Sequence, residues 1–248
     1  MIWIIGGTTE SRELVENIEG DTKFVITSAT ESEKEFINIP NLLTGRLDYY
    51  DMIKFVEEKN INLIIDLSHP YAEIVSSNAK KVALEKNIKY IRYVRKKSDI
   101  PSYVVYFKAL EECLEYLKNI SGTVFFTTGS KNIRDFEKVR GKNRYIYRVL
   151  PASLSIEECK KYNIHMKDII ALLGPFSKEF NKIMFKEYDA NYVVMKDSGK
   201  EGGFIERLEA CKDLDITPVV IGRQKEEGIH NLEEILRVIN KWSQGKEI

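Results

Sequence analysis

The chain has 248 residues, and its 38 Lys and Arg balance its 38 Asp and Glu, so the formal net charge is zero. A domain that binds nucleic acid by phosphate attraction, or a membrane surface through a polybasic segment, is usually clearly basic, so this balance argues against both. With 43% hydrophobic and 31% charged residues, the composition is that of a soluble globular protein and not of a disordered one.

The cysteines also limit the class of protein. Cys113, Cys159 and Cys211 are odd in number and widely spaced, without a CxxC motif, so we expect no disulfide framework and no metal site. The N-terminus turns polar too soon for a signal peptide, and no apolar run approaches the ~20 residues of a membrane span. These features predict a cytoplasmic protein.

Short β-branched runs alternate with helical patterns along the whole chain. The expected strands are residues 2–5, 23–27, 41–44, 62–67, 89–94, 123–127, 144–149, 168–173, 192–195 and 217–221. The helical patterns between them begin at capping residues or at proline: Thr8 or Thr9, Asp48, Pro70 in a first turn, Ser155 and Ser177. Strands separated by helices predict an α/β fold of βαβ units with mainly parallel sheets.

The pattern starts again near Ser121-Gly122, which predicts two such units in tandem, residues 1–120 and 121–248. Ligands of parallel α/β sheets bind beyond the carboxyl ends of the strands. The loops there are rich in Gly, Ser, Thr and positive charge, as a phosphate or carboxylate site requires.

The first of these loops, Gly6–Thr9, has two interpretations. It is either the pyrophosphate site of a dinucleotide or only the tight turn that any strand-to-helix connection needs, because it lacks the full GxGxxG spacing. The second strand ends in Thr27-Ser28, with no acid to bind ribose hydroxyls, so NADPH stays open beside NADH.

Three other residue patterns bear on the chemistry of the site. His69 follows the fourth strand, where it either handles a proton or anion or simply caps a helix. Tyr192 and Lys196 have the spacing typical of short-chain dehydrogenases, but they fall in a strand, which separates them by ~13 Å, so that family is rejected. Lys131, beside Gly129-Ser130, is the ligand contact expected from an otherwise solvated basic run.

Taken together, the loops resemble the precorrin-6A and cobalt-precorrin-6A reductases of vitamin B12 biosynthesis. The matching segments run in family order: GGTTESR (6–12), GRL (45–47), HPYA (69–72), RYVR (92–95), TTGSKN (127–132), RVLP (148–151), GPFSKEFN (174–181) and KDSGKEGG (196–203). One departure is Ser11, where the family usually has Ala.

The resemblance implies two Rossmann-like domains that face an inter-domain cleft, the first of them binding the dinucleotide. It also implies hydride transfer from NADH or NADPH to a ring double bond of a corrin precursor that carries many carboxylates. The cofactor would contact Gly6, Gly7, Thr8, Thr9, Arg12, Ser28, Gly129, Ser130 and Lys131. The substrate would contact Arg46, His69, Arg92, Arg95, Ser177, Lys196, Ser198, Gly199, Gly202, Gly203 and Arg223. The residues considered for proton donation or orientation are His69, Tyr71 and Asp197.

Two alternatives remain. One is a Rossmann-type reductase or epimerase of a smaller substrate, which would lack converging Arg and Lys. The other is a regulatory protein that binds nucleotide without turnover.

Overall fold

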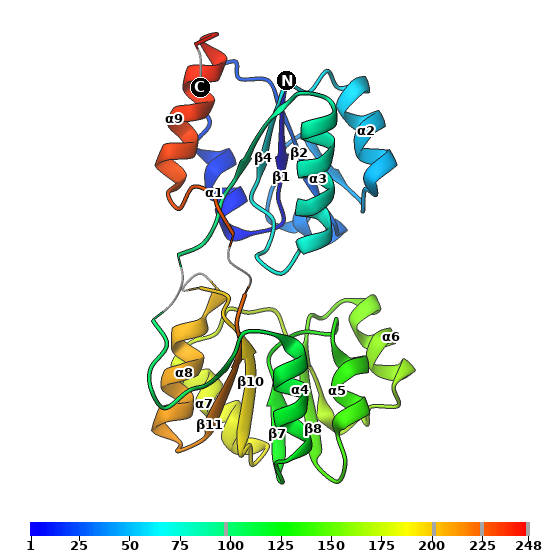
Figure 1. Ribbon diagram of the computed structural model, residues 1–248, viewed down its shortest axis with the longest axis vertical. Coiled ribbons are helices and arrows are strands. Elements are labelled where there is room, and N and C mark those ends of the chain that lie inside the picture. The colour runs from blue at the N-terminus through cyan, green and yellow to red at the C-terminus, as the bar shows by residue number, and fades with distance from the viewer. Residues whose placement is uncertain (97–98, 200–201, 224–225, 247–248) are drawn as a thin grey trace. The chain divides into compact units, whose positions relative to one another are not determined.

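The computed structural model describes residues 1–96, 99–199, 202–223 and 226–246, and it contains two compact units (Figure 1). The first unit comprises Met1–Lys96 and Lys225–Ile248, and the second comprises Lys97–Gln224. Each unit is a parallel β-sheet with helices on both faces. The expected α/β class with mainly parallel sheets is therefore confirmed.

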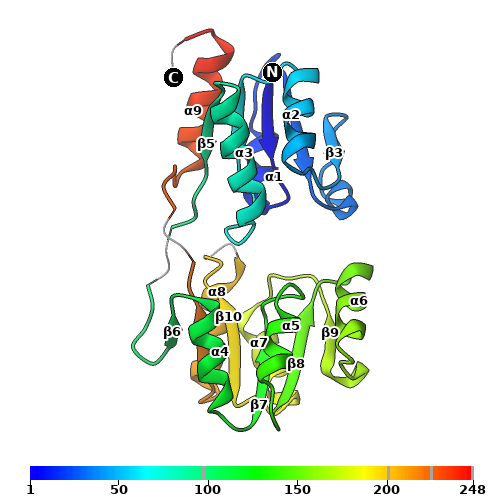
Figure 2. The same cartoon turned by 45° about the vertical axis from the view of Figure 1, so that its right-hand side comes forward.

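The sheet of the first unit has the strand order β3-β2-β1-β4-β5 (Figures 1 and 2). Its strands are β1 (Ile2–Ile5), β2 (Phe24–Ser28), β3 (Leu42–Thr44), β4 (Leu63–Asp66) and β5 (Lys89–Arg92). The central strands β1 and β4 are buried at every residue, as expected when both faces of a parallel sheet are covered. The chain runs outward from β1 to β3 and then reverses to β4, so the switch point of this sheet lies between β1 and β4.

Alternating side chains of these strands pack against different helices. Ile2 and Ile4 face α1 (Thr9–Glu16) and α9 (Leu232–Ser243), whereas Trp3 and Ile5 face α2 (Tyr49–Glu58) and α3 (Glu73–Glu85). A short 3₁₀ helix, η1 (Glu31–Glu35), follows β2.

The sheet of the second unit has the order β6-β11-β10-β7-β8-β9, again all parallel. Its strands are β6 (Val105–Phe107), β7 (Thr123–Phe126), β8 (Arg144–Val149), β9 (Ile169–Ala171), β10 (Tyr192–Lys196) and β11 (Thr217–Ile221). One face packs against α4 (Leu110–Lys118), α5 (Ile133–Val139) and α6 (Ser153–Lys161), and the other against α7 (Lys178–Glu187) and α8 (Phe204–Asp213). A 3₁₀ turn, η2 (Met166–Asp168), precedes β9. The switch point of this sheet lies between β7 and β10.

The division of the chain differs from the expected one at residue 120. Strand β6 joins the second sheet beside β11, and helix α9 returns to the first sheet. Ile235 and Ile239 of α9 are fully buried there, in the same core cluster as Leu14 and Val15 of α1. The segment before α9 pairs with the chain after β5, and a Cβ at Gly228 would lie 2.3 Å from the carbonyl oxygen of Arg92.

Local boundaries also differ. Helix α3 begins at Glu73, because Pro70 lies in a turn before it, and α6 begins at Ser153, so that Ser155 is inside the helix. The three-residue strand β6 and the helix α8 were not expected. In the segments that the structure describes, no helix is both long enough and apolar enough to span a membrane. The same segments contain no group of three or more His, Cys, Asp or Glu placed to hold a metal.

Candidate functional site

The first candidate site lies at the switch point of the first sheet, where two loops meet. Residues 6–8 follow β1, and the segment from Leu67 to Tyr71 follows β4. The Thr8 hydroxyl donates a hydrogen bond of 2.9 Å to the Leu67 carbonyl, which ties the two loops together. In open α/β sheets, the switch point is where ligands bind.

The two glycines of the first loop are required by different constraints. A Cβ at Gly6 would lie 2.8 Å from Cδ1 of Ile26 and 3.0 Å from the Ser11 hydroxyl oxygen, so any larger residue would have to displace these side chains. Gly7 has φ +93°, and a Cβ there would lie 3.3 Å from the Ser28 hydroxyl oxygen. Gly7 and Thr9 are exposed, and neither backbone N–H donates to another described residue. Open N–H groups at a helix amino end fit a phosphate group.

Ser11, the departure from the family pattern, fixes this turn. Its hydroxyl accepts from the Thr8 backbone N–H at 3.1 Å and donates to the Thr8 carbonyl at 2.8 Å. In return, the Thr8 hydroxyl accepts from the Ser11 backbone N–H, which completes a capping box. The hydrogen bonds that hold this turn therefore come from the chain itself.

A buried ion pair joins this helix to the end of β5. Arg95 donates from Nε and Nη2 to both carboxylate oxygens of Glu10, in the first turn of α1. Burial by itself would raise the pKa of Glu10, but the hydrogen bonds and charge of Arg95 outweigh it and hold that pKa below the usual 4.5. An ionised Glu10 alone would repel a phosphate at this helix end, and Arg95 neutralises it.

A second buried ion pair holds the loop after β4. Arg92 donates from Nη1 to the Asp66 carboxylate at 3.0 Å and to the Ser68 carbonyl at 2.9 Å. Asp66 also accepts from the Ser68 backbone N–H and from the Tyr90 hydroxyl. Burial and the Asp66 carboxylate raise the pKa of Tyr90, so this hydroxyl keeps its proton. The resemblance assigned both Arg92 and Arg95 to the substrate. In the structure, each of them is paired with a carboxylate of the protein.

The other residues assigned in this unit differ in exposure. Arg12 binds Glu33 through two hydrogen bonds and lies 3.9 Å over the Phe36 ring, so its charge is already neutralised. Ser28 is buried beside Gly7, and Arg46 after β3 is exposed and has no ion pair with another described residue.

His69 and Tyr71 lie next to each other in the loop after β4. Their ring centroids are 5.8 Å apart, and the Tyr71 backbone N–H donates to Nδ1 of His69 at 3.3 Å. His69 is exposed and does not cap a helix, because Ala72 is the residue before α3. With Nδ1 accepting, Nε2 is the ring nitrogen that carries the proton of the neutral imidazole.

The second candidate site is the corresponding edge of the second sheet. Gly129-Ser130-Lys131 follow β7, with Gly129 at φ +74°, and Lys196 at the end of β10 donates to the Asn132 side chain at 3.1 Å. Asp197 and Arg223 follow β10 and β11 and form a buried ion pair at 3.6 Å. Asp197 therefore lies at the carboxyl edge of the second sheet, and its partner there is the Arg223 guanidinium.

The KDSGKEGG loop packs against the loop after β9. Gly203 is left-handed at the start of α8, and a Cβ there would lie 3.0 Å from Cβ of Pro175. Arg207 of α8 donates to the Ser198 hydroxyl at 2.9 Å and to the Gly202 carbonyl at 2.8 Å. Gly199 is buried, and the Ser177 hydroxyl caps α7. Lys200 and Glu201, within the same motif, lie outside the described residues.

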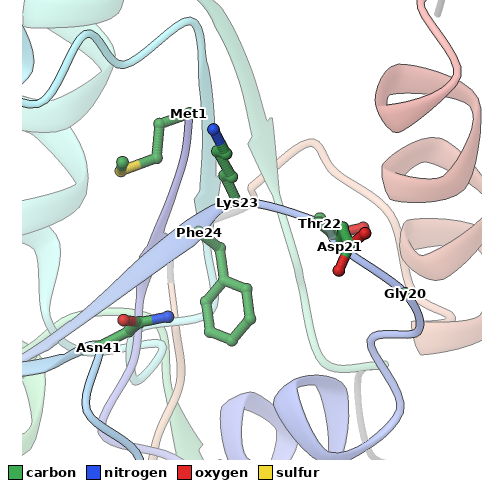
Figure 3. Close-up of a pocket in the computed structure, with 7 residues that line it drawn as sticks. All are labelled: Met1, Gly20, Asp21, Thr22, Lys23, Phe24 and Asn41. Atoms are coloured by element: carbon green, nitrogen blue, oxygen red, sulfur yellow. The ribbon is translucent and has the colours of Figure 1, made fainter.

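Figure 3 shows a pocket in the first unit, lined by Met1, Gly20, Asp21, Thr22, Lys23, Phe24 and Asn41. Its volume is about 520 Å³. Met1 and Lys23 directly precede β1 and β2, so the pocket lies at the amino edge of the sheet, away from the glycine turn. We do not assign the reaction to it.

The sequence analysis did not identify Glu10, Asp66, Arg148 or Arg207 as site residues. Glu10 lies 85 positions from its partner Arg95, and Asp66 ends a strand in an otherwise apolar run. The sequence feature that points to Glu10 is its place in the first turn of a helix. Acids are common at that place in helices that bind no ligand, so the feature does not identify a site residue.

Comparison with known proteins identifies the family. The chain matches the precorrin-6x reductases CbiJ/CobK over residues 1–240. The chain belongs to this family. It is 34% identical to the cobalt-precorrin-6A reductase of Priestia megaterium over 234 residues, 91% of each chain. It is also 34% identical to that of Methanocaldococcus jannaschii over 230 residues, 90% of each chain.

A solved structure described as CobK precorrin-6A reductase has the same fold, with a TM-score of 0.79 at 17% identity over 97% of this chain and 96% of that one. Family membership makes this protein an oxidoreductase of cobalamin biosynthesis that acts with a hydride donor. It also removes the regulatory alternative.

The Glu10–Arg95 pair gives a testable prediction. Glu10→Gln leaves the Arg95 charge buried without its carboxylate, and we expect a loss of about 3 kcal/mol in the free energy of unfolding near neutral pH. Because the folded state lowers the pKa of Glu10, its contribution is present above 4.5 and is lost as the pH falls below that value.

Urea unfolding at neutral and acidic pH measures this difference. Glu13→Gln, at an exposed position of the same helix, is the control and should change stability little. A difference between Glu10→Gln and the unsubstituted protein that stays constant into the acidic range would contradict the assigned role.

Proposed function

We propose that this protein reduces cobalt-precorrin-6A to cobalt-precorrin-6B with a hydride from NADH or NADPH. The curated relatives that are 34% identical carry the name of this activity. The observation that supports the cofactor is the glycine turn at the switch point of the first sheet, with the open N–H groups of Gly7 and Thr9 at the amino end of α1.

The residues around this turn fit a dinucleotide diphosphate. Gly6 and Gly7 keep the space that a Cβ would fill, and the capping box holds the turn in place before binding. Arg95 cancels the charge of Glu10, so that the helix end stays attractive to an anion. A bound nicotinamide supplies the hydride, and the protein positions it and excludes competing chemistry.

Reduction of a ring double bond also needs a proton. His69 is an exposed titratable side chain at this edge, and in its protonated form it gives up a ring proton to the substrate. Loss of that proton leaves a neutral imidazole whose Nδ1 accepts from the Tyr71 backbone N–H, so this contact favours proton release. Tyr71, whose ring lies beside that of His69, orients the imidazole. Asp197 forms a buried ion pair with Arg223, and its role is to position that arginine.

The carboxyl edge of the second sheet fits a flat ring with peripheral carboxylates. Exposed apolar side chains follow its adjacent strands β8 and β9, namely Leu150, Leu172 and Leu173. Lys131 is exposed after β7. This combination of apolar surface and positive charge favours a corrin precursor over a small polar substrate.

The direct test is turnover. With cobalt-precorrin-6A, the protein should consume NADH or NADPH in proportion to the substrate reduced, measured as loss of reduced-nicotinamide absorbance. The cobalt-containing and the metal-free substrate are each assayed with NADH and with NADPH. The rates show which substrate and which cofactor the enzyme prefers. Absence of substrate-dependent oxidation with every combination would refute the proposal.

Gly7→Ala tests the position of the cofactor. The new Cβ faces Ser28 and takes up space at the turn, so we expect the affinity for NADH or NADPH to fall by about tenfold or more. Gly20→Ala is the matched control, because Gly20 also has positive φ in the same unit but lies away from this edge. Calorimetry measures both, and equal cofactor affinity of the two variants would count against this placement.

His69→Gln tests the proton donor. It should lower kcat by about a hundredfold and leave the affinity for the nicotinamide cofactor unchanged, because the ring moves a proton and does not bind the dinucleotide. The pH profile of kcat provides the second measurement. The fall in kcat that accompanies deprotonation of His69 should be absent in the variant. If kcat is unchanged, another group or water delivers the proton.

A further inference from the structure

Arg148, near the end of β8, is a buried arginine whose partners among the described residues are all neutral. Its exposed fraction is 9%, and its Nη1 donates to the side-chain oxygen of Asn181 at 2.9 Å. Its guanidinium lies 5.0 Å from the centroid of the Phe176 ring. None of the ion pairs found among the described residues involves Arg148.

This lack of a carboxylate is unusual for a buried charge, because burial of an ion without a counter-ion is costly. Arg144, on the same face of β8, shows the ordinary arrangement, with the buried Asp168 carboxylate at 2.9 Å. Burial, and then the positive charge of Arg207, lower the pKa of Arg148 to about 9. Both the burial of Arg148 and the nearby charge of Arg207 therefore disfavour its charged form in the folded protein.

The surroundings of Arg148 add to the positive potential. Alternation along β8 places its side chain on the face covered by α7 and α8. Both helices are ten residues long and begin at this edge, α7 at the capping Ser177 and α8 at Gly203. Arg207 of α8 contributes a second guanidinium to this region, and the amino ends of α7 and α8 add partial positive charge. Glu206, in the first turn of α8, brings an opposing carboxylate to the same helix end.

We propose that Arg148, between the amino ends of α7 and α8, is an anion subsite that binds a carboxylate of the corrin precursor. This assignment rests on the proposed function for the identity of the ligand. The apolar side chains of Leu150, Leu172 and Leu173 at the same strand ends favour a carboxylate attached to a ring over a free phosphate. Asn181 and Phe176 hold the guanidinium so that its remaining donors face the ligand.

The test compares two arginines of one strand. Arg148→Gln removes the charge but keeps a donor for Asn181, so the melting temperature of the free protein should stay equal or rise. Its affinity for cobalt-precorrin-6A, measured by calorimetry without cofactor, should fall by about ten- to a hundredfold. Arg144→Gln should do the opposite, with lower stability because Asp168 loses its partner, and unchanged substrate affinity.

Three results would overturn the assignment. The first is an Arg148→Gln variant that binds the substrate as tightly as the unsubstituted protein. The second is a loss of melting temperature or of folding in that variant, which would make Arg148 a structural residue. The third is weaker binding of NADH or NADPH with substrate affinity unchanged, which would make the ligand a cofactor phosphate.

Two further measurements separate this proposal from the proposed function. Arg148→Lys keeps the charge but loses the planar fork, and we expect substrate affinity about tenfold below that of the arginine. Tricarballylate, a simple tricarboxylate, should raise the melting temperature of the unsubstituted protein and not that of Arg148→Gln. If that difference is found but no hydride transfer occurs, the subsite stands and the proposed function fails.

Discussion

Charge neutralisation at the carboxyl edge of the first sheet is the constraint on which the candidate cofactor site depends. Glu10 and Asp66 are both buried at that edge, and each would be costly to ionise alone. Arg95 and Arg92, from the chain at the end of β5, supply the two counter-ions. The turn of α1 and the loop after β4 are therefore held by charges that come from a third loop, and the Thr8–Leu67 hydrogen bond connects them.

The buried arginines of the two units differ in the kind of partner that they bind. In the first unit, Arg92 and Arg95 have carboxylate partners, so they stabilise loops and leave backbone N–H groups of the glycine turn to meet a ligand. In the second unit, Arg223 is paired with Asp197, whereas the partners of Arg148 among the described residues are the neutral side chains of Asn181 and Phe176. We infer that phosphate recognition in the first unit uses the backbone and that carboxylate recognition in the second uses a guanidinium.

Much of the candidate site could be predicted from the sequence, because its motifs follow strands whose carboxyl ends share one edge. The glycine turn, His69 with Tyr71, and the Gly129–Lys131 loop all lie at such edges. The arginines could not be sorted in this way. Arg92, Arg95 and Arg148 look alike in the sequence. Their partners lie 26, 85 and 33 positions away, and only these partners show that the first two arginines are paired with carboxylates and the third with an amide.

The sequence by itself determined the α/β class, the parallel strands and the family, because hydrophobic periodicity and motif order are local properties. It did not determine where the chain divides or which charges are neutralised. Helix α9 has the amphipathic pattern of any surface helix, and nothing local says that Ile235 and Ile239 pack on the first sheet rather than the second. Ion pairs and the packing of helices on sheets join distant segments, so only the tertiary structure decided them.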